Sequence, residues 1–358
     1  MSTEGMNEDA LWEDEDLQDE ADAIQEPEVR LHLKVDKGQE MTRIDKFLQH
    51  LIKGATRNKI QQAIESDFVL VDGKPVKSNY KIKAGQEITV FEYRRQDTTE
   101  IIPQKMNLNI VYEDEDLLVV NKPDSMVVHP GCGNYSDTLV NGIAYYLNPD
   151  ENKERIIELP RVGLVHRIDK DTSGLLVIGK TEAAVQHLSA QFKRHEVHRR
   201  YIGLAWGDFE SDSGTITGHV GRNLRFRKKM DVFPEGDHGK HAITHYKVLE
   251  RFHYTTLLEF RLETGRTHQI RVHAKYIGHP LFNDETYGGN VIVKGTVYAK
   301  YKQFVENNFK ILPRHALHAK ELGFIHPTKG VMMRFDSELP KNMQQVIDRW
   351  RAYVQQPV

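Results

Sequence analysis

The chain has 358 residues, of which 39% are hydrophobic and 28% are charged. That length allows two domains with a core of ordinary size and an additional tail. Its apolar runs are far shorter than the roughly 20 residues that span a bilayer, and the first residues lack the regions of a signal peptide. The composition therefore excludes a membrane-spanning protein. The single Cys132 favours a reducing compartment, with the cytoplasm as the expected location.

The net charge of −3 conceals two oppositely charged regions. Residues 1–29 contain twelve acidic side chains and no lysine or arginine, which leaves 40 acidic and 49 basic residues and a charge of about +9 for the rest of the chain. A basic body favours a polyanionic partner such as nucleic acid. We expect the acidic stretch to be a disordered tail that solubilises the protein or, alternatively, competes with RNA for the basic surface.

A compact unit is expected over residues 41–92. Apolar residues recur at helical spacing from Ile44 to Leu51, and Thr56 can cap a second amphipathic helix. The polar side of that second helix carries Arg57 and Lys59, which are able to bind phosphates and sugars of RNA.

A small hairpin should complete this unit. Residues 68–71 are typical of a strand that enters a turn at Asp72-Gly73, and another strand is expected at 88–91. Lys74 is the first of several lysines in the hairpin. The whole pattern, RIDKFL…TRNKIQQAIES…VLVDGKPVKSNYKIKAGQEI, resembles the alpha-L RNA-binding domain shared with a small-subunit ribosomal protein, so we expect this unit to bind RNA.

Residues 93–106 show little periodicity and are expected to form a linker. The remaining residues, 107–350, are numerous enough for one catalytic domain. That domain opens with two predicted strands, 108–112 and 117–120, which lead to Asn121-Lys122-Pro123.

A charged loop followed by a buried strand is predicted around Asp169. The segment His166–Gly174 reads HRIDKDTSG, and the four apolar residues 175–178 that follow are too few for a core helix. This pattern places Asp169 at a strand entrance, where a rigid sheet can hold a functional carboxylate still. By local chemistry alone, the same aspartate could simply cap the turn.

Two further strands carry candidate site residues. Residues 199–207 predict a strand that contains Tyr201, and the strand at 257–262 leads into the sequence ETGRTHQIRVH, which contains Arg266 and Arg271. Between these strands, residues 219–241 are expected to form a loop that grips single-stranded or bulged RNA. Its basic residues, interleaved with Phe226, include Arg225, Arg227, Lys228 and Lys229.

These motifs together resemble the RNA pseudouridine synthases of the RluA/RluD type, whose signature reads H-R-[LI]-D-x-x-[TS]-[ST]-G and whose later motif reads G-R-[TS]-H-Q-[IL]-R-x-H. The resemblance implies that Asp169 is the catalytic carboxylate, that Arg271 (or Arg266) pairs with it, and that Tyr201 stacks on the target base. It also implies that Arg167 fills space beside the flipped nucleotide.

The resemblance covers roughly residues 41–350 and implies a fold. We expect a mixed α/β (α+β) catalytic domain built on a long, mainly antiparallel sheet, preceded by the small alpha-L domain. The closing L-H-A…H-P motif is also matched, although Asp336–Pro340 stands where the family usually continues with Ala-Pro.

Converting uridine to pseudouridine needs no redox step and no external energy source, and no cofactor motif is found. The 18 histidines show no zinc pattern, since His195-Glu196-Val197-His198 has the wrong spacing, so we expect no metal. The catalytic carboxylate must be ionised, which a paired arginine favours. Whether it attacks the sugar, attacks the base or removes a sugar proton remains open at this point.

The order of domains most resembles family members that act on large-subunit ribosomal RNA, and tRNA is the alternative substrate. A non-catalytic RNA-binding or ribosome-assembly protein is one rival interpretation. A glycosidase-like hydrolase that uses Asp169 and Asp171 is another. We expect a monomer that binds no membrane.

Overall fold

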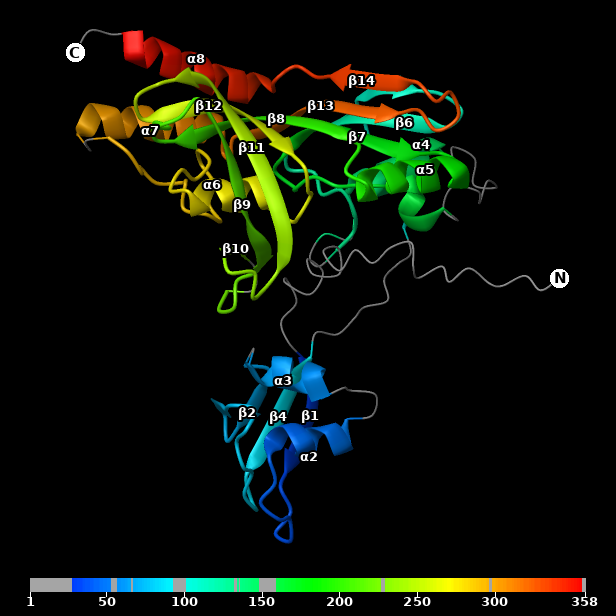
Figure 1. Ribbon diagram of the computed structural model, residues 1–358, viewed down its shortest axis with the longest axis vertical. Coiled ribbons are helices and arrows are strands. Elements are labelled where there is room, and N and C mark those ends of the chain that lie inside the picture. Colours follow the sequence, from blue (N-terminus) through cyan, green and yellow to red (C-terminus); the bar gives the residue numbers. More distant parts are fainter. Residues whose placement is uncertain are drawn as a thin grey trace, which may run out of the picture. The chain divides into compact units, whose positions relative to one another are not determined.

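A computed structural model describes residues 28–52, 57–65, 67–92, 101–131, 134, 136–147, 159–226, 229–295 and 298–355. The predicted acidic tail, apart from its last two residues, lies outside this described part. The chain forms two compact units (Figure 1). The first contains the elements up to residue 92, and the second contains the elements from residue 110 onward.

The N-terminal unit packs two helices against a four-stranded antiparallel sheet. The helices are α2 (Ile44–Leu51) and α3 (Arg57–Glu65), and the strands, in the order β1-β4-β2-β3, are β1 (Glu28–Lys34), β4 (Glu87–Glu92), β2 (Val69–Val71) and β3 (Lys74–Pro75). Fully buried Ile44 and Leu48 lie one helical turn apart on α2 and enter the core, as the apolar spacing predicted.

The hairpin between β2 and β3 is confirmed. Asp72 and Gly73 have φ angles of 49° and 73°, the two positive values of a type I′ turn, which suits the twist of paired strands. Strand β1 was not predicted from the sequence. It pairs with β4 along its length, so the sheet of this unit begins at Glu28.

The second unit is built on a ten-stranded sheet in the order β10-β9-β11-β12-β8-β13-β7-β6-β5, with β14 also paired to β13. All of these pairings are antiparallel except β13 with β7. The expected mixed α/β fold with a long, mainly antiparallel sheet is confirmed. The strands are β5 (Ile110–Glu113), β6 (Leu117–Lys122), β7 (Ser173–Gly179), β8 (His198–Trp206), β9 (Ser213–Arg222), β10 (Met230–Phe233), β11 (Lys240–Arg251), β12 (Thr255–Leu262), β13 (Leu317–Ile325) and β14 (Met332–Asp336).

Helices cover both faces of this sheet, as Figure 1 shows. They are α4 (Leu139–Leu147), α5 (Glu182–Lys193), α6 (Gln269–Tyr276), α7 (Ala299–Ile311) and α8 (Lys341–Gln355), with a 3₁₀ turn at Pro160–Gly163. Successive side chains of β8 pack into different hydrophobic cores, because side chains alternate between the two faces of a strand. Tyr201 and Ala205 pack with residues of α4 and α6, whereas Leu204 and Trp206 pack with residues of α7 and α8.

The predicted loop at 219–241 is wrong in part. Its first residues end β9, its middle forms β10, and its last residues begin β11. Val220 and Val232 face each other in the β9–β10 pair and are buried, so the alternation of apolar residues outweighs the glycines and the proline.

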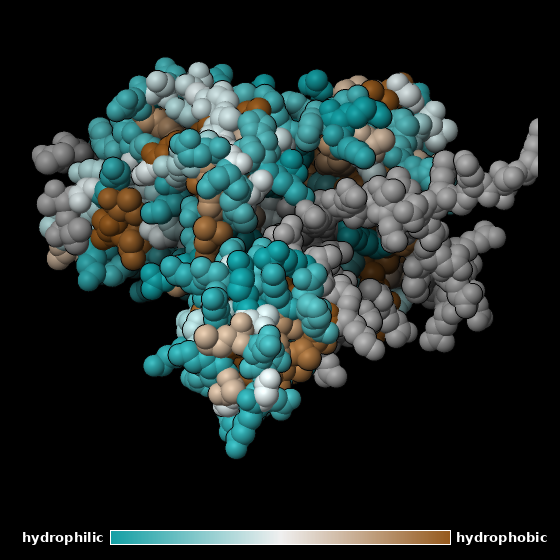
Figure 2. Space-filling view, turned by 60° about the horizontal axis from the view of Figure 1, so that its bottom comes forward, coloured by the Kyte–Doolittle hydropathy of each residue, from teal (hydrophilic) through white to brown (hydrophobic). Residues whose placement is uncertain are grey.

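The surface view in Figure 2 is mostly hydrophilic, with hydrophobic residues in separate patches. Within the described part of the chain, no helix combines the length and the apolar character that crossing a membrane requires.

Candidate active site

The loop that carries Asp169 ends at the entrance of β7, as predicted. The amide of Thr172 donates to the carbonyl of Asp169 over 3.1 Å, and every residue of β7 is buried. Gly174 is required at this point, because it has a φ of 123° and a Cβ there would lie 2.2 Å from the carbonyl oxygen of Ala319. The glycine therefore lets β7 and β13 approach each other just after the loop.

Arg271 joins the Asp169 loop to a second carboxylate. Its Nη1 lies 3.0 Å from Oδ2 of Asp169, while its Nε and Nη2 donate to the two carboxylate oxygens of Asp284 over 2.8 and 3.0 Å. Arg271 and Asp284 are buried, with 7% and 0% of their side chains exposed, and the side chain of Asp169 is 18% exposed. The paired geometry fixes the guanidinium plane, and with it the position of Asp169.

Asp169 is held in its ionised form. Burial acts to raise the pKa of this carboxyl, but the neighbouring side chains of His268 and Arg271, the second of which also donates a hydrogen bond to it, outweigh burial and lower the pKa well below its usual range. Burial, followed by the charge of Arg271, lowers the pKa of His268 to about 4, so this histidine is neutral at pH 7. Arg271 therefore supplies the charge that keeps Asp169 ionised.

Tyr201 lies in the same cross-strand row as the start of β7. It pairs with Ala319 of β13, which in turn pairs with Gly174. Tyr201 is 8% exposed, and burial raises the pKa of its phenol, followed by the effects of Arg199, which lowers it, and of Asp169, which raises it. The tyrosine is thus neutral, and the charge of the Asp169 carboxylate contributes to the rise of its pKa.

Lys122 binds the backbone of the Asp169 loop. Its Nζ donates to the carbonyls of Pro123, Met126 and Lys170 over 2.8, 2.8 and 2.9 Å, and the side chain is buried. Burial lowers the pKa of Lys122 to about 7, against the raising effect of Asp169 and Asp171. Three acceptors match the three donors of an ammonium group, so this geometry favours the charged form.

Arg314 also binds the Asp169 loop. It is buried, pairs with Asp124 over 2.6 Å, and donates from Nη1 to the carbonyl of Asp171 over 3.0 Å. Two buried histidines bind the next two hydroxyl groups: His315 bonds Thr172 over 2.8 Å, and His318 bonds Ser173 over 2.9 Å. Backbone and side-chain atoms of the residues that follow Asp169 are therefore held by buried side chains.

The turn before α6 carries another fixed pair. His268 has a left-handed φ of 54°, and its Nδ1 lies 2.9 Å from the hydroxyl of Tyr287. That hydroxyl also accepts a hydrogen bond from the amide of Met230 over 3.0 Å. The guanidinium of Arg271 lies over the ring of Tyr287, with 5.2 Å between Cζ of Arg271 and the centroid of the ring.

The predicted RNA-binding residues are spread over both units. Arg57 contacts the buried carboxylate of Asp45 over 3.0 Å, while its own side chain remains 44% exposed. The guanidinium of Arg266 donates to the carbonyl of His241 over 3.2 Å.

The other basic candidates have the following positions. Arg167 lies two residues before Asp169, and its charge helps to lower the pKa of His268 after burial and Arg271. Lys74 and Lys229 are exposed, as is Arg225, whose guanidinium lies 5.3 Å from the centroid of the Phe226 ring. The side chain of Lys59, and Arg227 and Lys228 entirely, lie outside the described residues.

One group of described residues has the composition of a metal site. Asp114, Asp116 and His326 bring their ligand atoms within 4.8 Å of one another. The ammonium of Lys329 already lies 2.7 Å from Asp114, and the hydroxyl of Tyr112 donates to the same carboxylate over 2.7 Å. The group is therefore satisfied as an internal hydrogen-bond network.

Several residues of the site have no role in the sequence motifs, among them Lys122, Asp284, Tyr287 and Arg314. Lys122 stood in Asn121-Lys122-Pro123, to which two predicted strands lead, and Asp284 and Tyr287 stood shortly after the motif that contains Arg271. Their nearness to those segments was the available signal. Arg314 had none, since it lies 143 residues from the loop that it binds.

Comparison with known proteins identifies the class to which this chain belongs. A profile of the family described as RNA pseudouridylate synthase matches residues 116–276, and a profile of the S4 domain matches residues 42–88. The chain belongs to the RNA pseudouridine synthases, which are isomerases.

Particular relatives extend the match over most of the chain. An uncharacterised RNA pseudouridine synthase of Chlorobaculum parvum is 43% identical over 89% of this chain and 97% of that protein. The ribosomal large subunit pseudouridine synthase D of Escherichia coli K12 is 38% identical over 90% of this chain and 95% of that protein. The solved structure of human RNA pseudouridylate synthase domain containing 4 shares the fold, with a TM-score of 0.53, 20% identity, and coverage of 68% of this chain and 93% of that one.

Proposed function

We propose that this protein isomerises specific uridines to pseudouridine in large-subunit ribosomal RNA, with Asp169 as the catalytic carboxylate. The bond between Asp169 and Arg271 carries the proposal, since it keeps a partly exposed carboxylate ionised beside a tyrosine. The similarity to the ribosomal large subunit pseudouridine synthase D supports the choice of RNA. The S4 domain supplies a second surface for that RNA.

The reaction breaks the bond between N1 of uracil and C1′ of ribose and joins C5 of the base to C1′. The base must leave its stack first, at a cost of a few kcal/mol. Asp169, as an acceptor-only carboxylate, acts on the ribose or the base, and Arg271 keeps it charged while the bond breaks. Tyr201 supports the extruded base from β8, and Arg167 occupies the space beside that base.

The test compares wild type with Asp169→Asn on protein-free large-subunit ribosomal RNA. Pseudouridines are mapped by carbodiimide labelling and primer extension. We expect new stops with wild type and none with Asp169→Asn, at equal RNA affinity. Asp171→Asn is the matched control, because the carbonyl rather than the side chain of Asp171 binds Arg314, and it should leave the stops in place.

Other outcomes separate the alternatives. Stops with both wild type and Asp169→Asn would mean that another carboxylate is catalytic. Stops on tRNA alone would move the substrate to tRNA. Release of free uracil would identify a hydrolase, and tight RNA binding without any product would identify a binding protein.

A further inference from the structure

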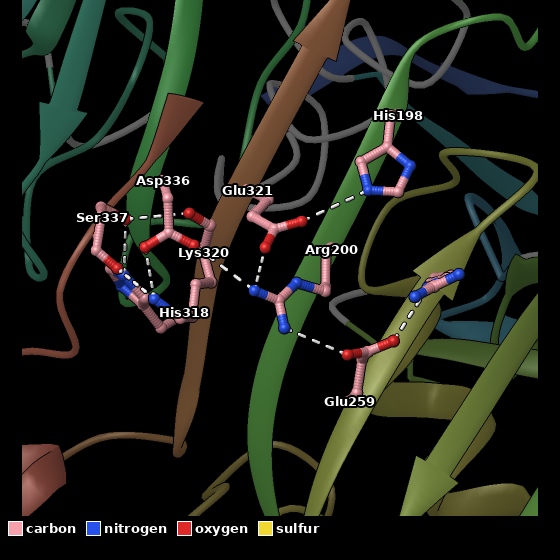
Figure 3. Close-up of polar contacts among 9 residues, drawn as sticks. His198, Arg200, Glu259, His318, Lys320, Glu321, Asp336 and Ser337 are labelled. Carbon is pink, nitrogen blue, oxygen red and sulfur yellow. Dashed lines mark hydrogen bonds and ion pairs between the residues drawn. The ribbon is translucent and has the colours of Figure 1, made fainter. Parts of the chain in front are cut away.

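Arg199 of β8 is partly buried, as is Arg200, but the two differ in their contacts. Arg200, its neighbour on β8, lies 3.1 Å from Glu259 and also pairs with Glu321, as Figure 3 shows. Among the residues that the structure describes, no carboxylate lies within ion-pair distance of Arg199. Its Nε is buried without a hydrogen-bond partner, and its Nη2 reaches only the carbonyl of Glu263, at 3.5 Å.

The side chain of Arg199 nevertheless has specific neighbours that position it. Its guanidinium lies 5.7 Å from the centroid of the Phe192 ring, which stacks on His166 with 4.4 Å between centroids. A Cβ on Gly265 would lie 2.7 Å from Nη1 of Arg199, although Gly265 has no positive φ that would itself require glycine. The glycine therefore serves to leave room for this guanidinium.

The surroundings of Arg199 are positively charged. Burial, followed by the charges of Arg199 and Arg266, lowers the pKa of His195. Glu263 is the nearby acid, and its carboxylate is exposed and lies 2.6 Å from His245 instead. An enclosed cation without an anion is costly, because burial disfavours charge unless a partner compensates it. An anionic group of a ligand would supply that compensation.

The anion must bind close to the candidate active site. Arg199 and Tyr201 are two residues apart on β8, so their side chains leave the same face about 7 Å apart. Arg199 also affects the pKa of the Tyr201 phenol, second to burial. A nucleotide whose base lies at Tyr201 carries its phosphates within reach of such a neighbour.

We propose that Arg199 binds a backbone phosphate of the RNA next to the target uridine, in a space that Gly265 keeps open. This subsite rests on the proposed function, since it assumes that the uridine lies at Asp169 and Tyr201. A fork of guanidinium donors suits two phosphate oxygens at once. Binding the phosphate would draw the neighbouring nucleotide towards Asp169.

The experiment measures RNA affinity of the full-length protein by fluorescence anisotropy at several salt concentrations. The probe is a short stem-loop RNA whose sequence surrounds a uridine that the wild-type protein modifies. If the wild-type protein modifies no uridine, the probe is large-subunit ribosomal RNA. Arg199→Met, which keeps the stem over Phe192, should weaken binding about tenfold. It should also reduce the slope of log Kd against log salt by about 0.7 to 0.9, the value for one phosphate contact.

Three other variants separate charge from packing. Arg199→Lys should restore most of the salt slope. Gly265→Ala should weaken binding while keeping the charge, because it displaces the tip of Arg199, and it also tests the subsite if Arg199→Met does not fold. Lys300→Gln removes a charge from an exposed position on α7 and should change nothing.

A second probe locates the phosphate. Neutral methylphosphonate linkages are placed singly on either side of the target uridine. Wild type should lose affinity at one of them, and Arg199→Met should be insensitive there. Equal salt slopes and equal sensitivity to every linkage in wild type and Arg199→Met would overturn the subsite. Absence of pseudouridine with wild type would instead overturn the proposed function, and the salt slopes would still report on the phosphate contact.

Discussion

Asp284 grips the guanidinium of Arg271 through both carboxylate oxygens, at 2.8 and 3.0 Å, and leaves Nη1 of Arg271 for Asp169. Asp284→Asn removes this anchoring charge, so Arg271 should shift away from Asp169. We expect kcat to fall on the order of a hundredfold, since small misplacements of catalytic groups have effects of that size. Single-turnover pseudouridine formation measures the loss, and RNA affinity should stay constant.

The matched control is Asp348→Asn, which breaks an exposed pair with Arg351 on α8 and should leave kcat unchanged. Equal rates for Asp284→Asn and wild type would show that Arg271 needs no second carboxylate.

Lys122→Met should lower kcat with little change in the KM for RNA. The substitution leaves three carbonyls without their donor and releases the backbone of Lys170, next to Asp169. The expected loss of unfolding free energy is about 1–3 kcal/mol. Steady-state kinetics and urea unfolding measure the two effects, and the control is Lys170→Met, which removes an exposed side chain of the same loop. If the control slowed the reaction as much as Lys122→Met, the anchoring role would be wrong.

Gly174→Ala should destabilise the second unit by more than about 3 kcal/mol. Alanine would have to adopt a φ of 123° and place its Cβ against the carbonyl of Ala319. Gly278→Ala is the comparison, because Gly278 has a φ of 82° but no atom within 4 Å of an added Cβ, and about 1–2 kcal/mol of strain is expected there. Urea denaturation distinguishes the two, and similar losses would argue against the close approach of β7 and β13.

The protein should lose stability as the pH falls from 6.5 towards 4. Burial lowers the pKa values of several histidines to about 3 or 4 in the folded chain, against 6.5 for an ordinary histidine. They are His166, His268, His273, His315 and His318. In this window the unfolded chain binds more protons, so the free energy of unfolding falls by about 1.4 kcal/mol per pH unit for each histidine.

His273→Gln tests one of these groups. His273 is fully buried and bonds Thr244 over 2.9 Å. Whatever its effect on total stability, the variant should reduce the slope of unfolding free energy against pH by about 1.4 kcal/mol per pH unit between pH 5 and 6. An unchanged slope would mean that His273 titrates equally in the folded and unfolded chains.

Much of the secondary structure follows from local patterns. Helical spacing predicted α2, the Asp72-Gly73 dipeptide predicted the hairpin turn, and the short apolar run after Asp169 predicted β7. Such features depend on residues a few positions apart, so the sequence contains the information directly. The basic stretch at 219–241 was harder to interpret, because glycines and charges hid the alternation that forms β10.

The sequence by itself determined the order of the motifs. The resemblance of these motifs to those of a known family predicted the family, the fold and the pairing of Asp169 with an arginine. Tertiary structure alone decided that Arg271 rather than Arg266 makes that pair, across 102 residues, and that Asp284, Lys122 and Arg314 fix its surroundings. It likewise decided that Arg200 pairs with Glu259 and Glu321, whereas no carboxylate of the described residues lies within ion-pair distance of Arg199. The physical reason is that the pKa of a carboxylate and the partner of a guanidinium depend on distances across the sheet, and local periodicity does not contain those distances.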